Sequence, residues 1–165
     1  MTNKTFISRR TLVTAALGLG LAPAFATAGK GEMAAANIEV WKDPSCGCCK
    51  DWVKHLEDNG FTVKVNDVGN SAARSRLGID RKYGSCHTAL VGGYAIEGHV
   101  PAQDIKRLLK QKPTAVGLAV PGMPVGSPGM DGPVYNNRKD SYDVLLLTRD
   151  GGSTVFQRYE GNVKA

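Results

Sequence analysis

Cysteine placement constrains this chain more than any other feature of its sequence. The chain has four cysteines in 165 residues, and three of them fall in the segment Cys46-Gly47-Cys48-Cys49. A domain that depended on disulfides for stability would spread its cysteines to close long loops, and adjacent cysteines are poorly placed to bridge each other. We therefore expect a fold built on a hydrophobic core, which this length can supply, and a cysteine cluster that carries chemistry.

Residues 1–26 have the pattern of an export signal. A region with three basic residues precedes the apolar run 12–21, and the small-x-small sequence Ala24-Phe25-Ala26 follows as a cleavage signal. The apolar run is too short to be a stable membrane span. Arg9 and Arg10 also resemble a twin-arginine signal, although an ordinary signal can contain such a pair by chance. We predict a periplasmic or otherwise exported protein.

The remaining residues divide into a short leader and one domain. Residues 27–37 are rich in Ala and Gly and lack periodicity, so we predict a disordered leader there and a globular domain over residues 38–162. Without residues 1–26 the chain carries 18 basic and 15 acidic residues, a net charge of +3. It has no cluster of basic and aromatic residues, so we expect no nucleic-acid partner, and we expect no membrane span after signal removal.

Apolar periodicity divides the domain into helices and strands. Apolar residues at i, i+3, i+4 and i+7 predict a helix from the cysteine motif to Asn59-Gly60, and Pro101 opens another helix. The polar segment 69–83 is expected to hold one short helix at residues 72–77. Strands are predicted at residues 38–41, 61–65, 88–91, 94–97, 142–148 and 154–159.

Residues 117–133 differ in character from the rest of the domain. They hold four prolines and five glycines, together with Met123 and Met130, and we expect a long loop that is functional or disordered. The order strand, helix, strand, linker, hairpin, helix, with Cys-x-x-Cys at the first helix, resembles the thioredoxin fold. We predict an α/β fold: a thioredoxin-like domain with a C-terminal β-hairpin extension and this long Gly/Pro/Met loop.

The start of a helix is a favourable place for thiolate chemistry. Unpaired backbone N–H groups and the positive end of the helix dipole favour the thiolate over the thiol. Cys46 and Cys49 share one helical face, whereas Cys48 points about 100° away from Cys49 if the turn is fully helical. Cys48 would then join the site only through an irregular first turn, which Gly47 permits. A redox dithiol of Cys46 and Cys49, or a metal site, fits this turn equally well.

The segment Cys86-His87-Thr88 favours the metal site. In a thioredoxin-like arrangement this segment packs against the cysteine turn, at the position where thioredoxins have a cis-proline. Here it offers a thiol and an imidazole, and the combined set suits Cu(I), zinc or an iron–sulfur cluster. Zinc needs four ligands and five are present, which favours copper. The alternative is that Cys86 is a small core residue and His87 a surface residue.

Other donor residues are weaker candidates. His99 precedes the helix at Pro101 and could approach the site, although capping or solvent exposure is the commoner role for such a residue. Met123 and Met130 are thioethers, which select Cu(I), although loop methionines more often serve packing. His55 lies about 10 Å along the helix from Cys48, so we expect it to be a solvated residue that cannot reach the metal.

Several motifs together resemble a known family, the CopG-type periplasmic copper-resistance proteins. The resemblance extends over residues 38–160 and rests on Cys46-Gly47-Cys48-Cys49, Cys86-His87-Thr88, Glu97-Gly98-His99-Val100-Pro101-Ala102, Gly117-Leu118-Ala119-Val120-Pro121-Gly122-Met123-Pro124 and Ser127-Pro128-Gly129-Met130. It implies a thioredoxin-like domain that binds copper, with several ions bridged by thiolates, and acts in copper redox or tolerance. It also implies the ligands Cys46, Cys48, Cys49, Cys86 and His87, and, as further ligands, Met123, Met130 and His99.

Three functions follow as hypotheses. The first is a periplasmic copper-binding protein that buffers Cu(I) or interconverts Cu(II) and Cu(I). The alternative is a metal-free thiol–disulfide oxidoreductase of the thioredoxin class, with Cys46 and Cys49 as its redox pair. The third is a module that passes copper to another periplasmic copper-handling protein and docks through the methionine-bearing loop.

Overall fold

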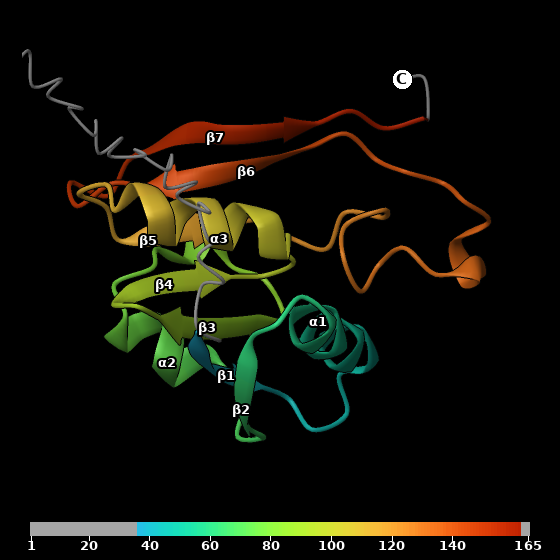
Figure 1. The fold of residues 1–165 in the computed structure, drawn as a ribbon, viewed down its shortest axis with the longest axis horizontal. Coiled ribbons are helices and arrows are strands. Elements are labelled where there is room, and N and C mark those ends of the chain that lie inside the picture. The colour runs from blue at the N-terminus through green and yellow to red at the C-terminus, as the bar shows by residue number, and fades with distance from the viewer. Residues whose placement is uncertain (1–35, 163–165) are drawn as a thin grey trace, which may run out of the picture. The chain divides into compact units, whose positions relative to one another are not determined.

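A seven-stranded mixed sheet organises residues 36–162, the part of the chain that the computed structural model describes (Figure 1). The strands are β1 (Asn37–Lys42), β2 (Thr62–Asn66), β3 (His87–Val91), β4 (Tyr94–Glu97), β5 (Gly117–Ala119), β6 (Tyr142–Leu147) and β7 (Ser153–Tyr159). The α-helices of this part are α1 (Gly47–Asp58), α2 (Ser71–Arg76) and α3 (Ala102–Gln111), and the 3-10 turns are η1 (Arg81–Tyr83) and η2 (Pro133–Tyr135).

The connections place the strands in the order β2-β1-β3-β4-β5-β6-β7. β1, α1 and β2 form a parallel βαβ unit, and β3 and β4 form an antiparallel hairpin that joins the sheet next to β1. Helix α3 then leads to β5, which is parallel to β4, and the antiparallel strands β6 and β7 extend the sheet. The closing hairpin is therefore continuous with the main sheet.

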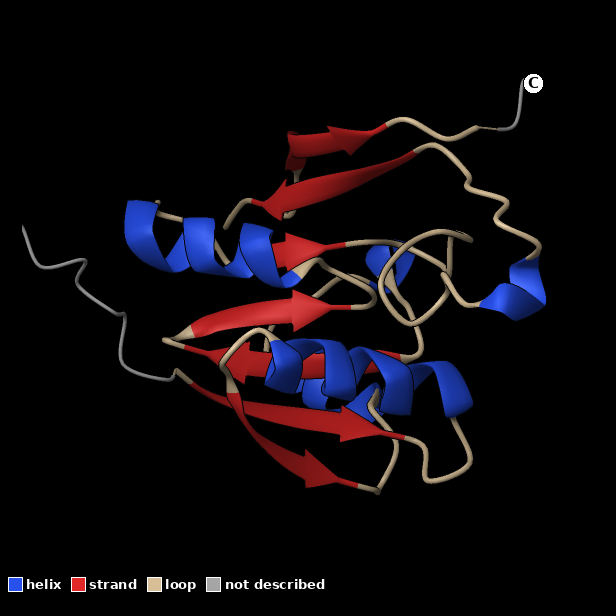
Figure 2. Cartoon of the chain, turned by 45° about the vertical axis from the view of Figure 1, so that its right-hand side comes forward, coloured by secondary structure: helices blue, strands red, loops and turns tan. Residues whose placement is uncertain are grey.

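The two faces of the sheet are covered differently. Helices α1 and α3 lie on one face, as Figure 2 shows, and bury the larger apolar cluster, to which α1 contributes Trp52, Val53 and Leu56. These three residues have the spacing i, i+1 and i+4 of a helix stripe. The segment that contains α2 and η1 covers the opposite face, where Ile79 and Tyr83 belong to a smaller cluster. Adjacent residues of the inner strands therefore face different clusters, as Ala95 and Ile96 of β4 do.

Strand β5 corrects the expected loop. Residues 117–133 were predicted to be irregular, but Gly117–Ala119 pair with both β4 and β6. The backbones approach so closely that a Cβ on Gly117 would lie 1.7 Å from the Ala95 carbonyl oxygen, which explains the glycine. Three residues that begin with Gly give little strand signal, whereas burial between two strands stabilises them. Residues 120–141 form the connection to β6, and η2 lies within it.

The other elements lie close to their predicted positions. The short helix expected at residues 72–77 is α2, and β1 begins at Asn37, one residue before the predicted start of the domain. The predicted signal peptide, and all of the predicted leader before residue 36, fall outside the described residues. Within residues 36–162, none of the helices combines the length and apolar character required to cross a membrane.

Candidate metal and thiol site

Strand pairing brings distant segments of the chain to one end of the sheet. The last residue of β1, Lys42, pairs with the first residue of β3, His87. The cysteine turn follows β1 and Cys86 precedes β3, so antiparallel pairing places them side by side. Thr88 pairs with Glu97 at the end of β4, which brings the next residues of the chain to the same end. Proximity of the two cysteine segments thus follows from the register of the sheet.

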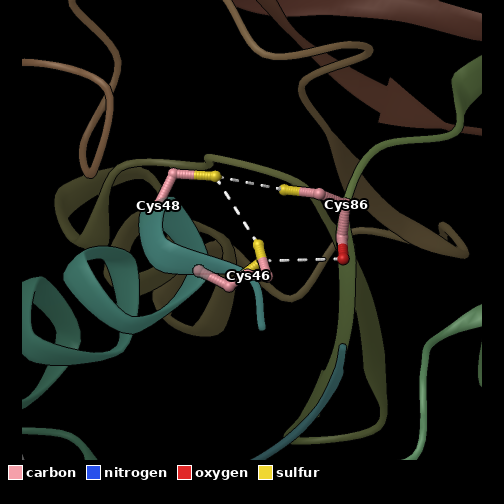
Figure 3. A group of neighbouring side chains, drawn as sticks. Cys46, Cys48 and Cys86 are labelled. Carbon is pink, nitrogen blue, oxygen red and sulfur yellow. Dashed lines mark hydrogen bonds between the residues drawn. A yellow bond between two sulfur atoms is a disulfide. The ribbon is translucent and has the colours of Figure 1, made fainter. Parts of the chain in front are cut away.

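The four cysteine sulfurs form one cluster, with every Sγ within 4.8 Å of the others. Cys46 and Cys49 are joined by a disulfide, and Cys48 and Cys86 are free thiols. The Cys48 sulfur lies 3.6 Å from that of Cys46 and 3.9 Å from that of Cys86 (Figure 3). Cys49 is fully buried, and its sulfur contacts the Cys86 carbonyl oxygen at 3.6 Å. The structure therefore shows the oxidised form of one pair beside two thiols.

Cys48 joins this cluster from a regular helix. α1 is helical from Gly47, and the residue before it, Cys46, caps the helix in an extended conformation with φ −69° and ψ 103°. Cys48 therefore needs no irregular turn to join the site, contrary to the sequence-based expectation. The extended Cys46 and the incoming Cys86 both approach the side of the first turn that Cys48 occupies.

Two buried histidines point ring nitrogens at Cys86. The Cys86 sulfur lies 3.4 Å from Nδ1 of His87 and 3.1 Å from Nε2 of His99. The second nitrogen of each ring lies close to a backbone carbonyl: His87 Nε2 is 2.9 Å from the oxygen of Gly98, and His99 Nδ1 is 2.8 Å from that of Pro128. A carbonyl only accepts hydrogen bonds, so these nitrogens carry the protons. Both lone pairs then face the Cys86 sulfur.

Burial sets the charge state of this group. Desolvation lowers the pKa of His87 well below its ordinary value and also lowers the pKa of His99, so both rings are neutral at neutral pH. Burial, followed by the neighbouring Cys48, raises the pKa of Cys86 to about 12. Trp52 packs against His87 with ring centroids 4.2 Å apart and donates its indole N–H to the carbonyl of Val100. Trp52 is therefore held in place and shields the cluster from solvent on its α1 side.

A buried carboxylate supports Cys86 from the other face of the sheet. Glu97 is fully buried and accepts hydrogen bonds from Arg74 Nε (2.8 Å), the Ser85 backbone N–H (2.7 Å) and Thr88 Oγ1 (2.5 Å). Burial raises the pKa of Glu97, and these donors oppose that effect. The Arg74 guanidinium also donates to the Ser85 carbonyl. Residues on either side of Cys86 are therefore anchored to one carboxylate.

The connection between β5 and β6 covers the site. Pro128 supplies the carbonyl that receives the His99 N–H, and a Cβ on Gly129 would lie only 2.6 Å from the Cys48 carbonyl oxygen. The hydroxyl of Ser85 donates to the carbonyl of Gly122, and Gly122 N–H donates to the carbonyl of Gly84. The loop is thus fastened to both cysteine segments.

The structure changes several sequence-based assignments. His99 is fully buried and contacts Cys86, so it is not the cap or exposed residue that was the commoner expectation. His55 is half-buried and its Nε2 accepts the Ala102 N–H, so it is not a solvated residue but a hydrogen-bond acceptor at the start of α3. Met123 is 51% exposed, and Met130 accepts a hydrogen bond from the hydroxyl of Tyr135 at 3.2 Å.

The hydrogen-bond network of Glu97, Arg74 and Thr88 was not predicted from the sequence. One signal was available, because the hairpin strand Tyr94–Glu97 places an acidic residue where a strand enters the core. A buried carboxylate requires partners, and the network therefore could have been suspected. Its basic partner could not be identified, because Arg74 lies 23 residues away on a helix with two arginines.

The donor set fits a soft metal ion. Sulfur ligands bind at about 2.3 Å in zinc sites, so two sulfurs on one ion lie at most about 4.6 Å apart, close to the spacing in this cluster. Cys86 belongs both to the four-cysteine group and to a second group with His87 and His99. Each histidine donates its other N–H to a carbonyl, as metal-binding histidines usually do. Reduction of the Cys46–Cys49 disulfide would make all four sulfurs available.

Comparison with known proteins agrees with this chemistry. A family model described as "Protein of unknown function, DUF411" matches residues 83–130. Two solved structures of copper resistance protein CopG, form 2 and form 1, share 50% and 51% sequence identity with the chain. Each has a TM-score of 0.70, and each match covers 76% of this chain and 98% of the CopG chain. No curated protein matches the sequence. Identity of this size over nearly the whole CopG chain shows that this protein belongs to the CopG family of copper-resistance proteins.

Proposed function

We propose that this protein is a periplasmic Cu(I)-binding protein whose ligands are Cys46, Cys48, Cys49, Cys86 and His87, with His99 as a further ligand. The convergence of two neutral imidazoles on the sulfur of Cys86 carries the proposal. Soft sulfur and imidazole donors favour Cu(I), and the CopG relatives are copper-resistance proteins. Zinc or an iron–sulfur cluster would use fewer of these donors.

The shared position of Cys86 supports binding of more than one ion. Its sulfur lies in both ligand groups, and a thiolate can bridge two metal ions. Met123 and Met130 belong to the loop that is fastened beside Cys86, and we include their thioethers as outer ligands. The role of the bound copper in this proposal is copper tolerance, through Cu(I) storage, Cu(II)/Cu(I) conversion or transfer to another copper-handling protein.

The fold supports a thioredoxin-like domain, and the signal pattern supports a periplasmic location. The βαβ unit followed by a ββα unit, with Cys-x-x-Cys at the first helix, supports a thioredoxin-like domain with a C-terminal hairpin extension. The basic, apolar and small-residue pattern of residues 1–26 supports export to the periplasm. In that compartment Cu(I) needs protection from oxidation, which thiolate ligands in a partly buried cluster provide.

A second candidate is a thiol–disulfide oxidoreductase. The Cys46–Cys49 disulfide favours it, because Cys-x-x-Cys pairs at helix starts exchange disulfides in thioredoxin-like proteins. This candidate predicts that apo protein reduces or oxidises a disulfide peptide, and that a Cys86→Ala/His87→Ala variant keeps this activity.

Elemental analysis of anaerobically purified, reduced protein separates the two. Cells would be supplied with copper, zinc and iron, and we expect the protein to retain copper. One equivalent of zinc without copper would contradict the copper proposal. The Cys86→Ala/His87→Ala variant should lose copper, whereas His55→Gln, which changes a histidine outside the cluster and keeps its hydrogen-bond acceptor, should retain it.

A further inference from the structure

The two thiols outside the disulfide face each other. Cys48 and Cys86 are both half-buried, and their sulfurs are 3.9 Å apart, roughly van der Waals contact (Figure 3). A covalent bond of about 2.05 Å requires the two sulfurs to approach each other by a further 2 Å or so. We propose that Cys48 and Cys86 are a second redox-active dithiol, so that the site stores four electrons instead of the two of a single Cys-x-x-Cys pair.

Geometry selects this pairing among the possible ones. Four cysteines allow three pairings, and one of them requires the unfavourable bridge between the adjacent Cys48 and Cys49. A second requires Cys49 to bond Cys86, but the Cys49 sulfur contacts the Cys86 carbonyl oxygen. The third combines the disulfide already present with the neighbouring pair of thiols. This pairing requires no thiol–disulfide exchange between the Cys46–Cys49 pair and the Cys48–Cys86 pair.

The electron balance names the oxidant. Two thiols that form a disulfide release two electrons and two protons, and each Cu(II) ion takes one electron to become Cu(I). Four thiols therefore reduce four Cu(II) ions, form two S–S bonds and release four protons to solvent. This step rests on the proposed copper function for its oxidant, whereas the second dithiol itself does not depend on copper.

Oxidation also changes how the site holds its product. A thiolate is a strong ligand for Cu(I), and a disulfide sulfur is a much weaker one. When both pairs are oxidised, the thiolates are gone and only imidazole nitrogens of the two ligand groups remain as strong donors. The reaction that produces Cu(I) thus also weakens its binding, which couples reduction of copper to its release.

Disulfide mapping on the full chain tests the proposal. All four cysteines would be reduced, the reductant removed without air, and excess Cu(II) added with a chromophoric Cu(I) chelator. Trypsin cuts at Lys42, Lys50, Lys82 and Lys106, which separates the cysteine turn from Cys86. We expect four Cu(I) per chain, no free thiols, and a disulfide that links tryptic peptides 43–50 and 83–106.

Variants and a second oxidant distinguish the outcomes. Cys48→Ser should give two Cu(I) per chain and lose the link between the peptides, and Cys86→Ser should do the same.

Diamide, a thiol oxidant without metal, should also form the link between the peptides in the wild-type chain. If diamide forms the link and Cu(II) does not, the second dithiol is supported and copper is not its oxidant. Cys48 and Cys86 that stay free under both oxidants, with copper still bound, would overturn the inference and leave the proposed function intact. Disulfide-linked dimers at low protein concentration would also overturn it.

Discussion

Two buried polar groups lie at the same end of the sheet, and they differ in what they leave unpaired. Around Glu97, Arg74, Ser85 and Thr88 donate hydrogen bonds that satisfy the carboxylate. In the cysteine–histidine cluster of Cys86, His87 and His99, each imidazole uses its N–H on a backbone carbonyl and directs its lone pair at one sulfur. Burial of polar groups therefore does not identify a ligand site, whereas two imidazole lone pairs that converge on one thiol, which can donate to only one of them, do.

The largest expected effect comes from the atom that the ligand groups share. Cys86→Ser should weaken Cu(I) binding by more than about 100-fold, because even residues behind metal ligands change affinity by about 10- to 100-fold. Competition with a chromophoric Cu(I) chelator under reducing conditions measures this. His55→Gln is the matched control and should bind like wild type. Wild-type affinity in Cys86→Ser would remove the basis for a shared ligand.

A change in the Glu97 network should act first on stability. Glu97→Gln leaves the largely buried guanidinium of Arg74 without its charge partner. The substitution should lower the free energy of unfolding by about 2–3 kcal/mol. Copper affinity of the folded protein should fall by about tenfold at most, since the ligands remain and only their support is loosened. Urea unfolding of apo protein and chelator competition measure the two effects. The distinction between the groups fails if Glu97→Gln abolishes copper binding and leaves stability unchanged.

A third buried polar group, the carboxylate of Asp104, provides the smallest effect and a control in another part of the fold. Asp104 on α3 accepts the hydroxyl of Tyr159 at 2.6 Å and pairs with Arg107 at 3.1 Å, and burial raises its pKa. A raised folded pKa means that the folded protein binds the proton more tightly than the unfolded chain does. As pH rises from about 4 through the folded pKa of Asp104, the free energy of unfolding of the wild type should therefore fall relative to that of Asp104→Asn. The fall should be at most about 1.4 kcal/mol per pH unit.

Urea unfolding of both proteins at a series of pH values measures this difference. Copper affinity should be the same in both, because Asp104 contacts Tyr159 and Arg107 and neither ligand group. A gain of wild-type stability over the variant with rising pH would show the opposite sign for the Asp104 shift.

Local sequence signals predicted most of the framework. The helix after the cysteine motif, the hairpin of residues 88–91 and 94–97 and the helix after Pro101 were each predicted from local patterns, and the structure has all three. Strand β5 was missed because Gly117 is explained only by its contact with Ala95, a partner in another strand. The sheet order depended on such long-range pairings throughout.

The site was predictable in its residue types but not in its geometry. The structure brings Cys46, Cys48, Cys49 and Cys86 together, as expected from the clustered thiols and from a thioredoxin-like packing of Cys86 against the cysteine turn. Which cysteines pair could not be read from spacing, because Cys46 had two neighbours within reach. The position of His99 depended on Pro128, a loop residue 29 positions away, and no local pattern reports such a contact.

X-ray absorption spectroscopy of the copper-loaded, reduced full chain identifies the atoms bound to the copper. We expect Cu(I) bound mainly by sulfur, with imidazole scattering that diminishes in a His87→Ala/His99→Ala variant. A copper environment of oxygen and nitrogen without sulfur, or imidazole scattering unchanged in that variant, would contradict it.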